Sequence, residues 1–315
     1  MKRAIQKVLR HAEVASEPPV CVDIGASGKL PAEWQLLAPY SIGVAFDADD
    51  REFRVDDAAN AGWKRLIKMN RLVAERPVDQ MQFYLTRSPY CSSALPPDNP
   101  RLEPWAFRDL FVVESRTWLG AVGLRQVLDQ LGIREIDWYK SDSQGMDLRI
   151  FASLGDELID QVIVADFEPG IIDAYAGEDK LFALMAYMDR RPFFMSDMKV
   201  GGSQRLDRAS QEALTGLQER FLSSILKICP GWAEVSYLND FSGSRSRRKF
   251  LLGWVFATIK QQDGHALVIA SRGLEEFNDS IFEECRRASV AQIRKRYPRL
   301  AMHILKRGVS RALRK

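Results

Sequence analysis

The chain has 315 residues, of which 46% are hydrophobic and 28% are charged, an ordinary composition for a globular protein. It contains no run of about 18 apolar residues, which a membrane-spanning helix needs, and its first residues lack the apolar core of a secretory signal. We therefore expect a cytoplasmic protein. Four cysteines without metal-type spacing and only three histidines argue against a structural zinc site and a disulfide framework.

Positive charge is concentrated at the C-terminus. Residues 288–315 hold nine lysines and arginines and no acid; since the whole chain carries +3, residues 1–287 carry −6. A basic segment that also contains apolar residues can lie on an anionic membrane, which would place the protein at the inner membrane face. It can equally pack on the acidic body through its apolar side, and the sequence leaves both interpretations open. The apolar residues of this tail are Val290, Ile293, Leu300, Ile304 and Leu305.

Strand and helix patterns alternate from residue 20 to residue 202. Residues 20–26 predict a buried strand that ends in glycine, residues 31–40 a helix that begins near Pro31, and residues 41–49 a second buried strand. Together they form a βαβ unit. Further strands are predicted at residues 80–88, 109–118, 134–141, 159–168 and 192–202. Further helices are predicted at residues 62–75, 124–132, 146–155 and 178–191, and an irregular loop at residues 89–100.

This alternation predicts an α/β fold with a Rossmann-like sheet, mainly parallel and covered by helices on both faces. We expect three regions. Residues 1–19 form an N-terminal helix, residues 20–202 form the α/β domain, and residues 203–315 form a mostly helical C-terminal extension that ends in the basic tail.

Ligands of such a sheet bind beyond the carboxyl ends of its strands. The first strand runs into a turn with two glycines, where the backbone can pass close to a ligand because no Cβ intervenes. The second strand ends in Asp47, which follows Gly28 by 19 residues and is well placed to accept hydrogen bonds from the hydroxyls of a ribose. The predicted cofactor-binding residues are Asp23, Gly25, Ala26, Ser27, Gly28, Asp47 and Asp49.

The same turn argues against a pyrophosphate ligand. A dinucleotide fingerprint would need glycine where Ser27 and Leu30 stand, and a P-loop would need Ser or Thr at residue 30. Asp23 would repel a phosphate but suits a cationic ligand with an amino-acid end, and S-adenosylmethionine meets these requirements. The alternative is that the glycines only form a tight turn between a strand and a helix.

Five segments of the chain resemble the FkbM-type methyltransferases: "VDIGASG", "FDAD", "YLTRSPYCSSALPPD", "IDWYKSDSQGMDLRIFASL" and "VIVADFEPG". The most specific element is Lys140-x-Asp142-x-Gln144-Gly145, and the resemblance covers residues 20–198. It implies a class I methyltransferase sheet in residues 20–202, S-adenosylmethionine as the cofactor, and O-methylation of a sugar, a glycan or a related natural product. Residues beyond 202 have no counterpart in it.

Methyl transfer to a hydroxyl needs the acceptor close to the methyl group and a base for its proton. Asp142 is the leading candidate for this base. Lys140 would neutralise developing charge or keep Asp142 ionised, and Glu168 is a second candidate for the base or a contact for the acceptor. Asp142 and Glu168 could also share a divalent cation through their oxygens, whereas zinc is not expected. The alternative is that Lys140 and Asp142 form a structural ion pair.

The predicted acceptor-binding residues are Tyr90, Ser92 and Gln144, because irregular segments on a rigid sheet often bind substrates. Ser92 and Ser93 could instead satisfy the backbone of a turn. Two other functions stay open: a catalytically silent cofactor-binding module, and a methyltransferase for nucleic acid or another small molecule. Nucleic acid is the weaker candidate because residues 1–287 are acidic. We expect the partner to be a glycan or small-molecule acceptor.

Overall fold

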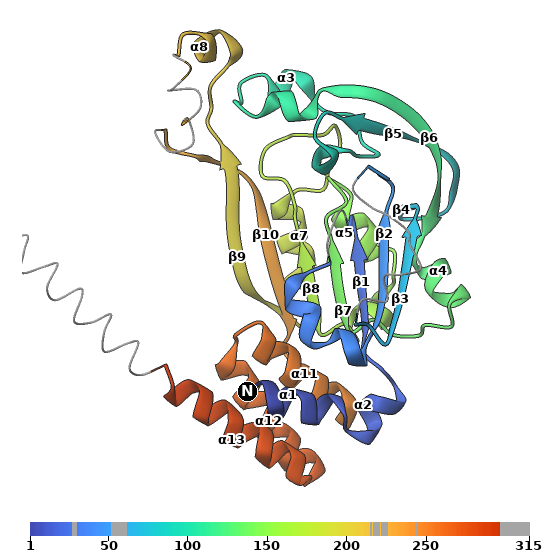
Figure 1. Cartoon of the computed structure of the whole chain (residues 1–315), viewed down its shortest axis with the longest axis vertical. Helices are drawn as coiled ribbons and strands as arrows, with labels where there is room; N and C mark the ends of the chain where they lie inside the picture. Colours follow the sequence, from blue (N-terminus) through green and yellow to red (C-terminus); the bar gives the residue numbers. More distant parts are fainter. Residues whose placement is uncertain are drawn as a thin grey trace, which may run out of the picture. The chain divides into compact units, whose positions relative to one another are not determined.

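The computed structural model describes residues 1–26, 30–51, 62–214, 216, 221, 226–243 and 245–296. The chain forms two compact units. One is the segment Pro19–Asp240, and the other joins Met1–Pro18 to the segment that begins at Phe241. The first unit is an α/β domain, and the described part of the second is made of helices (Figure 1).

The α/β domain is built on a seven-stranded sheet in the order β3-β2-β1-β7-β8-β10-β9. The first five strands of this order run parallel to their neighbours, and β10 runs antiparallel to β8 and β9. The mainly parallel α/β sheet that the sequence predicts is confirmed. The strands are β1 (Val20–Ile24), β2 (Ile42–Asp47), β3 (Arg65–Asn70), β7 (Trp138–Ser141), β8 (Val164–Phe167), β9 (Phe193–Ser203) and β10 (Cys229–Asn239).

Helices cover both faces of the central strands. All five residues of β1 are buried, as expected for a parallel strand inside a sheet. Trp138 and Tyr139 are neighbours in β7 and so point to opposite faces. Trp34 packs edge-on against Trp138 at a centroid distance of 5.9 Å, and Phe151 packs against Tyr139 at 4.8 Å. The described helices of this domain, with 3-10 helices marked η, are η1 (Ala32–Leu36), η2 (Ala38–Tyr40), η4 (Pro89–Cys91), α3 (Asn99–Leu102), η5 (Arg108–Phe111), α4 (Leu124–Gln130), α5 (Asp147–Ala152), α6 (Asp156–Ile159), α7 (Leu181–Met188) and α8 (Arg208–Glu212).

A second sheet of three strands, ordered β4-β6-β5, lies between β3 and β7 in the chain. It comprises β4 (Leu72–Ala74), β5 (Val78–Thr86) and β6 (Val113–Gly123). The helix predicted at residues 62–75 is wrong, because this segment forms β3 and β4. β3 is an edge strand whose residues are only half-buried or exposed, so its charged side chains hide the alternation of a strand. Pairing with β2 decides its conformation.

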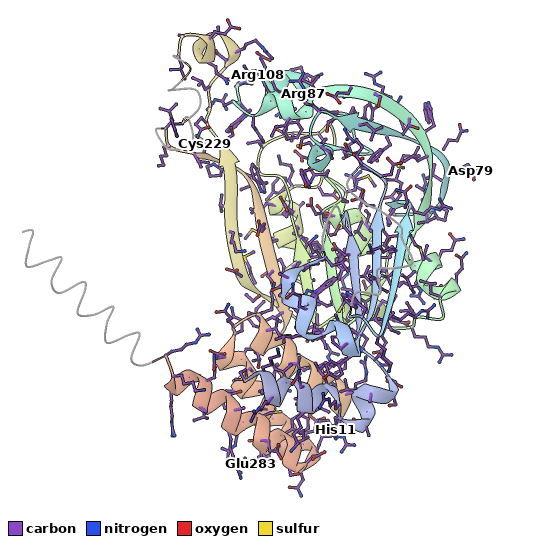
Figure 2. The ribbon with its side chains drawn as sticks, in the orientation of Figure 1. His11, Asp79, Arg87, Arg108, Cys229 and Glu283 are labelled. Atoms are coloured by element: carbon purple, nitrogen blue, oxygen red, sulfur yellow. The ribbon has the colours of Figure 1, made fainter. Side chains whose placement is uncertain are left out.

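The segment after residue 202 also differs from the prediction. Cys229, one of four free cysteines, begins β10, which lies between β8 and β9 (Figure 2). Ala233, Val235 and Tyr237 are buried at every second position, the alternation of a strand. The predicted boundary at residue 202 is therefore corrected: the α/β unit extends to Asp240.

The second unit contains α1 (Lys2–Leu9), α2 (Ala12–Ser16), α11 (Arg247–Ile259), α12 (Asp263–Phe277) and α13 (Ser280–Arg294). The N-terminal segment predicted as one helix forms two short ones. The apolar run at residues 250–259 lies in α11, which is buried from Arg248 to Thr258. Among the helices that the structure describes, none has the length and apolar character needed to cross a membrane.

Most of the basic tail lies outside the described residues, which end at residue 296. Within the described part, Arg296 forms an ion pair with Asp263 at 2.7 Å. The membrane contact that the tail suggests stays a prediction.

Candidate functional site

The carboxyl ends of β1, β2 and β7 meet where the strand order changes direction. From β1 the order continues to β2 on one side and to β7 on the other, and α/β sheets bind ligands at such a point. The backbone amides of Gly25 and Ala26 both donate hydrogen bonds to the Phe46 carbonyl at 2.9 Å. The Asp142 amide donates to the Ile24 carbonyl at 2.8 Å. These bonds fix the three strand ends relative to one another.

Gly25 allows the closest approach at this junction. Its φ is +76°, and a Cβ added to it would lie 2.0 Å from the carbonyl oxygen of Asp142. Only glycine fits, because other residues disfavour this conformation and a Cβ would overlap the backbone. Ser27 and Gly28, the other predicted residues of this turn, lie outside the described residues.

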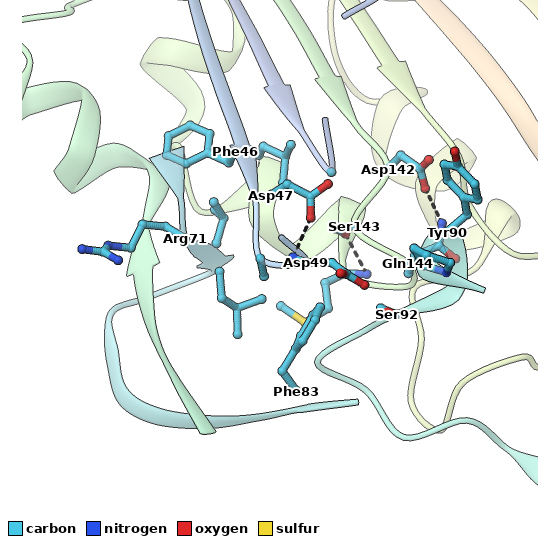
Figure 3. Close-up of a pocket in the computed structure, with 17 residues that line it drawn as sticks. Phe46, Asp47, Asp49, Arg71, Phe83, Tyr90, Ser92, Asp142, Ser143 and Gln144 are labelled. Atoms are coloured by element: carbon cyan, nitrogen blue, oxygen red, sulfur yellow. Dashed lines mark hydrogen bonds between the residues drawn. The ribbon is translucent and has the colours of Figure 1, made fainter. Parts of the chain in front are cut away.

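A pocket of about 580 Å³, including its part open to solvent, lies at these strand ends (Figure 3). We call it the strand-end pocket. Its acids Asp47, Asp49 and Asp142 lie at the ends of β2 and β7, and its apolar side includes Leu72, Val73 and Phe83 of the smaller sheet. The described residues that line it are Ile24, Gly25, Phe46, Asp47, Ala48, Asp49, Arg71, Leu72, Val73, Phe83, Pro89, Tyr90, Ser92, Asp142, Ser143, Gln144 and Met146. Residues predicted for the cofactor, the acceptor and catalysis thus meet in one pocket.

The Asp47 side chain lies at the end of β2 and extends into the pocket (Figure 3). Its Oδ1 accepts a hydrogen bond from the Asp49 amide at 2.8 Å, and its second oxygen adds a further acceptor. Asp47 is 9% exposed. Burial raises its pKa to about 7, with smaller contributions from the neighbouring acids Asp49, Asp142 and Asp23.

Asp49 and Ser92 are already engaged by an arginine. The Arg51 guanidinium forms an ion pair with Asp49 at 2.5 Å and donates to the Ser92 hydroxyl at 2.8 Å and the Thr86 carbonyl at 2.9 Å. Although burial opposes it, this arginine holds the pKa of Asp49 below its usual value. The Ser92 hydroxyl also accepts from the Thr86 amide at 3.2 Å, so Ser92 supports the backbone as well as lining the pocket.

Lys140 pairs with Asp23 across β1 and β7. Its Nζ donates to Asp23 Oδ1 at 2.8 Å, and Asp23 is only 1% exposed. Burial works against the charge of Lys140, but Asp23, Asp142 and Glu168 raise its pKa above the usual value. Neither Lys140 nor Asp23 is among the described residues that line the strand-end pocket. Lys140 therefore forms a structural ion pair, but its partner is Asp23 and not Asp142, the partner that the sequence analysis considered.

Asp142 is held by its neighbour in the motif. Gln144 has an unusual φ of +56°, and its amide nitrogen donates to Asp142 Oδ1 (Figure 3). The Tyr175 hydroxyl donates to Gln144 Oε1 at 2.8 Å, which sets the orientation of the amide. Burial raises the pKa of Asp142 to about 6, while the charge of Lys140 opposes this rise. The carboxylate is thus oriented through Gln144 and partly neutral near pH 6.

A second pocket of about 870 Å³, including its open part, shares Tyr90 and Gln144 with the first; we call it the aromatic pocket. The rings of Phe107 and Trp232 stack at 6.0 Å with 24° between their planes, and Phe111 meets Phe107 edge-on at 5.2 Å. The described residues that line it are Ser88, Tyr90, Cys91, Phe107, Leu110, Phe111, Gln144, Gly145, Glu168, Gly170, Ile172, Ala174, Tyr175, Glu178, Gly231 and Trp232.

Glu168 lines the aromatic pocket rather than the strand-end pocket. Burial, followed by the charge of Asp142, raises its pKa to about 8, and Lys140 opposes this rise only in part. A carboxyl group with a pKa near 8 can exchange a proton at neutral pH, as a general base must.

Most of the aromatic pocket could not be predicted from the motifs of the sequence. Trp232 lies in β10, which was expected to be helical, and Phe107 and Tyr175 lie in irregular segments without a motif. The alternation of apolar residues from Ala233 to Tyr237 is the signal that could have placed Trp232 on the sheet.

The described residues contain no group of three or more His, Cys, Asp or Glu side chains placed to hold a metal ion. Asp142 and Glu168, which could have shared a divalent cation, line different pockets. This geometry gives no support to a shared cation.

Replacing Gly25 should cost more stability than replacing a glycine with the same backbone conformation and open space. Gly132 has a φ of +70°, and no heavy atom lies within 4 Å of the position that a Cβ would take, so Gly132→Ala should cost about 1 kcal/mol. Gly25→Ala adds the overlap with Asp142, and we expect about 2–4 kcal/mol from denaturant unfolding. Equal losses in the two variants would contradict the close approach.

Glu168 should make stability depend on pH. Its folded pKa of about 8 lies above its ordinary value of 4.5, so the stability present at pH 4.5 is lost as the pH rises through 8. Glu168→Gln should therefore gain about 1–3 kcal/mol over the wild type at pH 8.5 and little at pH 5. Asp79→Asn, which removes an exposed acid of β5, is the control without such a gain. Urea unfolding at both pH values measures this, and no gain in Glu168→Gln at pH 8.5 would show that Glu168 is not desolvated.

No protein-family model matches the chain, and a search of curated proteins finds no match. The features of the chain that bear on function are therefore the two adjoining pockets, the acids that line them and the turn at Gly25.

Proposed function

We propose that the protein is an S-adenosylmethionine-dependent methyltransferase with a class I sheet, which methylates a hydroxyl of a small acceptor molecule. The observation that carries this proposal is the Asp47 carboxylate in a pocket at the switch point of the sheet, beside the turn at Gly25. In this proposal the strand-end pocket binds the cofactor, and the adjoining aromatic pocket binds the acceptor.

The residues present fit this cofactor. Asp47 offers carboxylate oxygens to the two hydroxyls of a ribose, and Gly25, which also lines the pocket, lets the ends of β1 and β7 come close together beside it. Asp23 is not part of this fit, because it is not among the described residues that line the pocket and its charge is paired with Lys140 at 2.8 Å. The apolar side of the pocket, which includes Leu72 and Phe83, suits a flat base.

Other nucleotides fit less well. The turn after β1 lacks the glycines of a dinucleotide fingerprint, so the sequence offers no dedicated cradle for a pyrophosphate. The sheet also departs from the dinucleotide-binding order at its edge, where the antiparallel strand β10 separates β8 from β9. These features favour a nucleoside ligand without a pyrophosphate.

In the proposed methyl transfer the acids have different roles. The cofactor supplies a methyl group on a sulfonium, which is transferred to the acceptor oxygen in line with the breaking bond. Asp142 takes the proton of the acceptor hydroxyl; Gln144 holds one of its oxygens and leaves the other to accept. Glu168 is the second candidate for this base, because it lines the acceptor pocket and has a pKa near neutrality. Lys140 acts at a distance, by favouring the ionised form of Asp142.

Tyr90 and Gln144 lie between cofactor and acceptor in this proposal, because they line both pockets. A ring-shaped acceptor such as a sugar or a related natural product fits the aromatic pocket, since aromatic side chains bury large apolar surfaces. The resemblance to the FkbM-type methyltransferases points to the same class of acceptor.

Isothermal titration should detect S-adenosylhomocysteine but not NAD or ATP. Ribose hydroxyls donate to the ionised Asp47, so affinity should fall about tenfold from pH 8 to pH 6, as expected for a pKa of about 7. Asp47→Asn should weaken binding by about 1.5–3 kcal/mol and abolish this dependence. Asp79→Asn, at an exposed position of β5, is the control (Figure 2). Binding of NAD without any response to S-adenosylhomocysteine would contradict the proposed cofactor.

Asp142→Asn should separate chemistry from cofactor binding. With labelled S-adenosylmethionine and a pool of small hydroxyl compounds as acceptors, we expect turnover to fall about a hundredfold or more, as for loss of a general base. Affinity for S-adenosylhomocysteine should stay within a few-fold, and Asp79→Asn should keep wild-type turnover. Full turnover in Asp142→Asn together with its loss in Glu168→Gln would assign the base to Glu168 instead.

A further inference from the structure

We propose that the acceptor carries an ammonium group, which the aromatic pocket binds between its aromatic rings and the carboxylate of Glu168. The inference rests on the proposed function, because it names the acceptor class for the pocket assigned to the acceptor. The acceptor is then a hydroxyl compound that also carries an ammonium group.

The charge of the aromatic pocket is the first argument. Its described lining residues include two glutamates, Glu168 and Glu178, and neither lysine nor arginine. The charge of Glu178 is balanced by Lys180, whose Nζ lies 3.4 Å from Glu178 Oε1. The same oxygen accepts a hydrogen bond from the Ala174 amide at 2.7 Å. Glu168 has no hydrogen bond or ion pair with any described residue. The pocket therefore contains an acid whose charge nothing in the described structure balances by contact.

The ionisation of Glu168 points the same way. Burial and the nearby charges of Asp142, Glu234 and Asp147 raise its pKa to about 8, against the weaker opposing effect of Lys140. A cation bound beside Glu168 would supply the missing positive charge and favour its ionised form. A neutral ligand would leave the Glu168 carboxyl group protonated and would have no charge interaction with it.

The rings supply the second argument. Phe107 and Trp232 stack at 6.0 Å, and Tyr175 meets Phe111 at 5.6 Å; these four aromatic side chains line the same pocket as Glu168. Aromatic faces attract cations, and alkylated ammonium groups are bound by such rings in other proteins. An unbalanced acid beside several rings is the combination that favours an ammonium group over a phosphate or a neutral hydroxyl.

The experiment compares choline with its neutral carbon isostere, in which a tert-butyl group replaces the trimethylammonium group. Both have the same shape and the same hydroxyl, so they differ in charge alone. Binding to the full-length protein is followed by saturation-transfer NMR, without cofactor, at pH 7.5. We expect choline to bind about tenfold more tightly than the isostere, or about 1.4 kcal/mol.

Three variants locate the site. Glu168→Gln, which keeps the shape of the side chain, should abolish most of the preference for choline. Glu234→Gln removes an acid that acts on Glu168 through space but does not line the pocket, and it should keep the preference. Asp47→Asn removes an acid of the strand-end pocket and should also keep it.

Equal affinity for the two probes, or no binding of either, would overturn the proposal. So would an unchanged preference in Glu168→Gln, or its equal loss in Glu234→Gln or Asp47→Asn. The measurement needs neither cofactor nor turnover, so the two proposals can fail separately. If only the methyltransferase proposal is wrong, the protein will prefer choline as expected but will not bind S-adenosylhomocysteine.

Discussion

The close approach of the backbone at Gly25 to the carbonyl of Asp142 is the constraint on which the site depends. It joins β1 to β7 at the switch point of the sheet, and the hydrogen bonds to Phe46 and Ile24 join β2 to the same corner. Asp47 and Asp142 are thereby held on opposite sides of one turn. A side chain at residue 25 would push the strand ends apart and disturb both acids.

The second feature is an excess of buried acids around one lysine. Lys140 balances Asp23 directly and reaches Asp142 and Glu168 only through space. The pKa values of Asp47, Asp142 and Glu168 therefore rise to about 7, 6 and 8. Keeping these acids buried costs stability above their ordinary pKa values, which is a common trade between stability and function. In both proposals the ligand brings a positive charge close to these buried acids and offsets their excess of negative charge.

The sequence predicts the central part of this arrangement because the patterns there are local. Buried strands that end in glycine or acid placed Gly25, Asp47 and Asp142 at one edge of the sheet, where the structure has them. Pairing between strands that are far apart in the chain produces no local sequence pattern of this kind. The charged residues of the edge strand β3 give a pattern that is typical of a helix. β10 follows a long segment with a helical pattern, although β10 itself belongs to the sheet. The partner of Lys140 and the aromatic pocket depend on such distant pairings, so the sequence did not show them.

The central claim is that the pocket at the switch point binds a sulfonium nucleoside with its ribose on Asp47 and its sulfur toward the wall shared with the aromatic pocket. A crystal structure of the complex with S-adenosylhomocysteine tests this most directly. The account predicts both ribose hydroxyls within hydrogen-bond distance of the Asp47 carboxylate and the sulfur facing Tyr90 and Gln144. A ribose bound away from Asp47, or a sulfur separated from the aromatic pocket by the sheet, would contradict it.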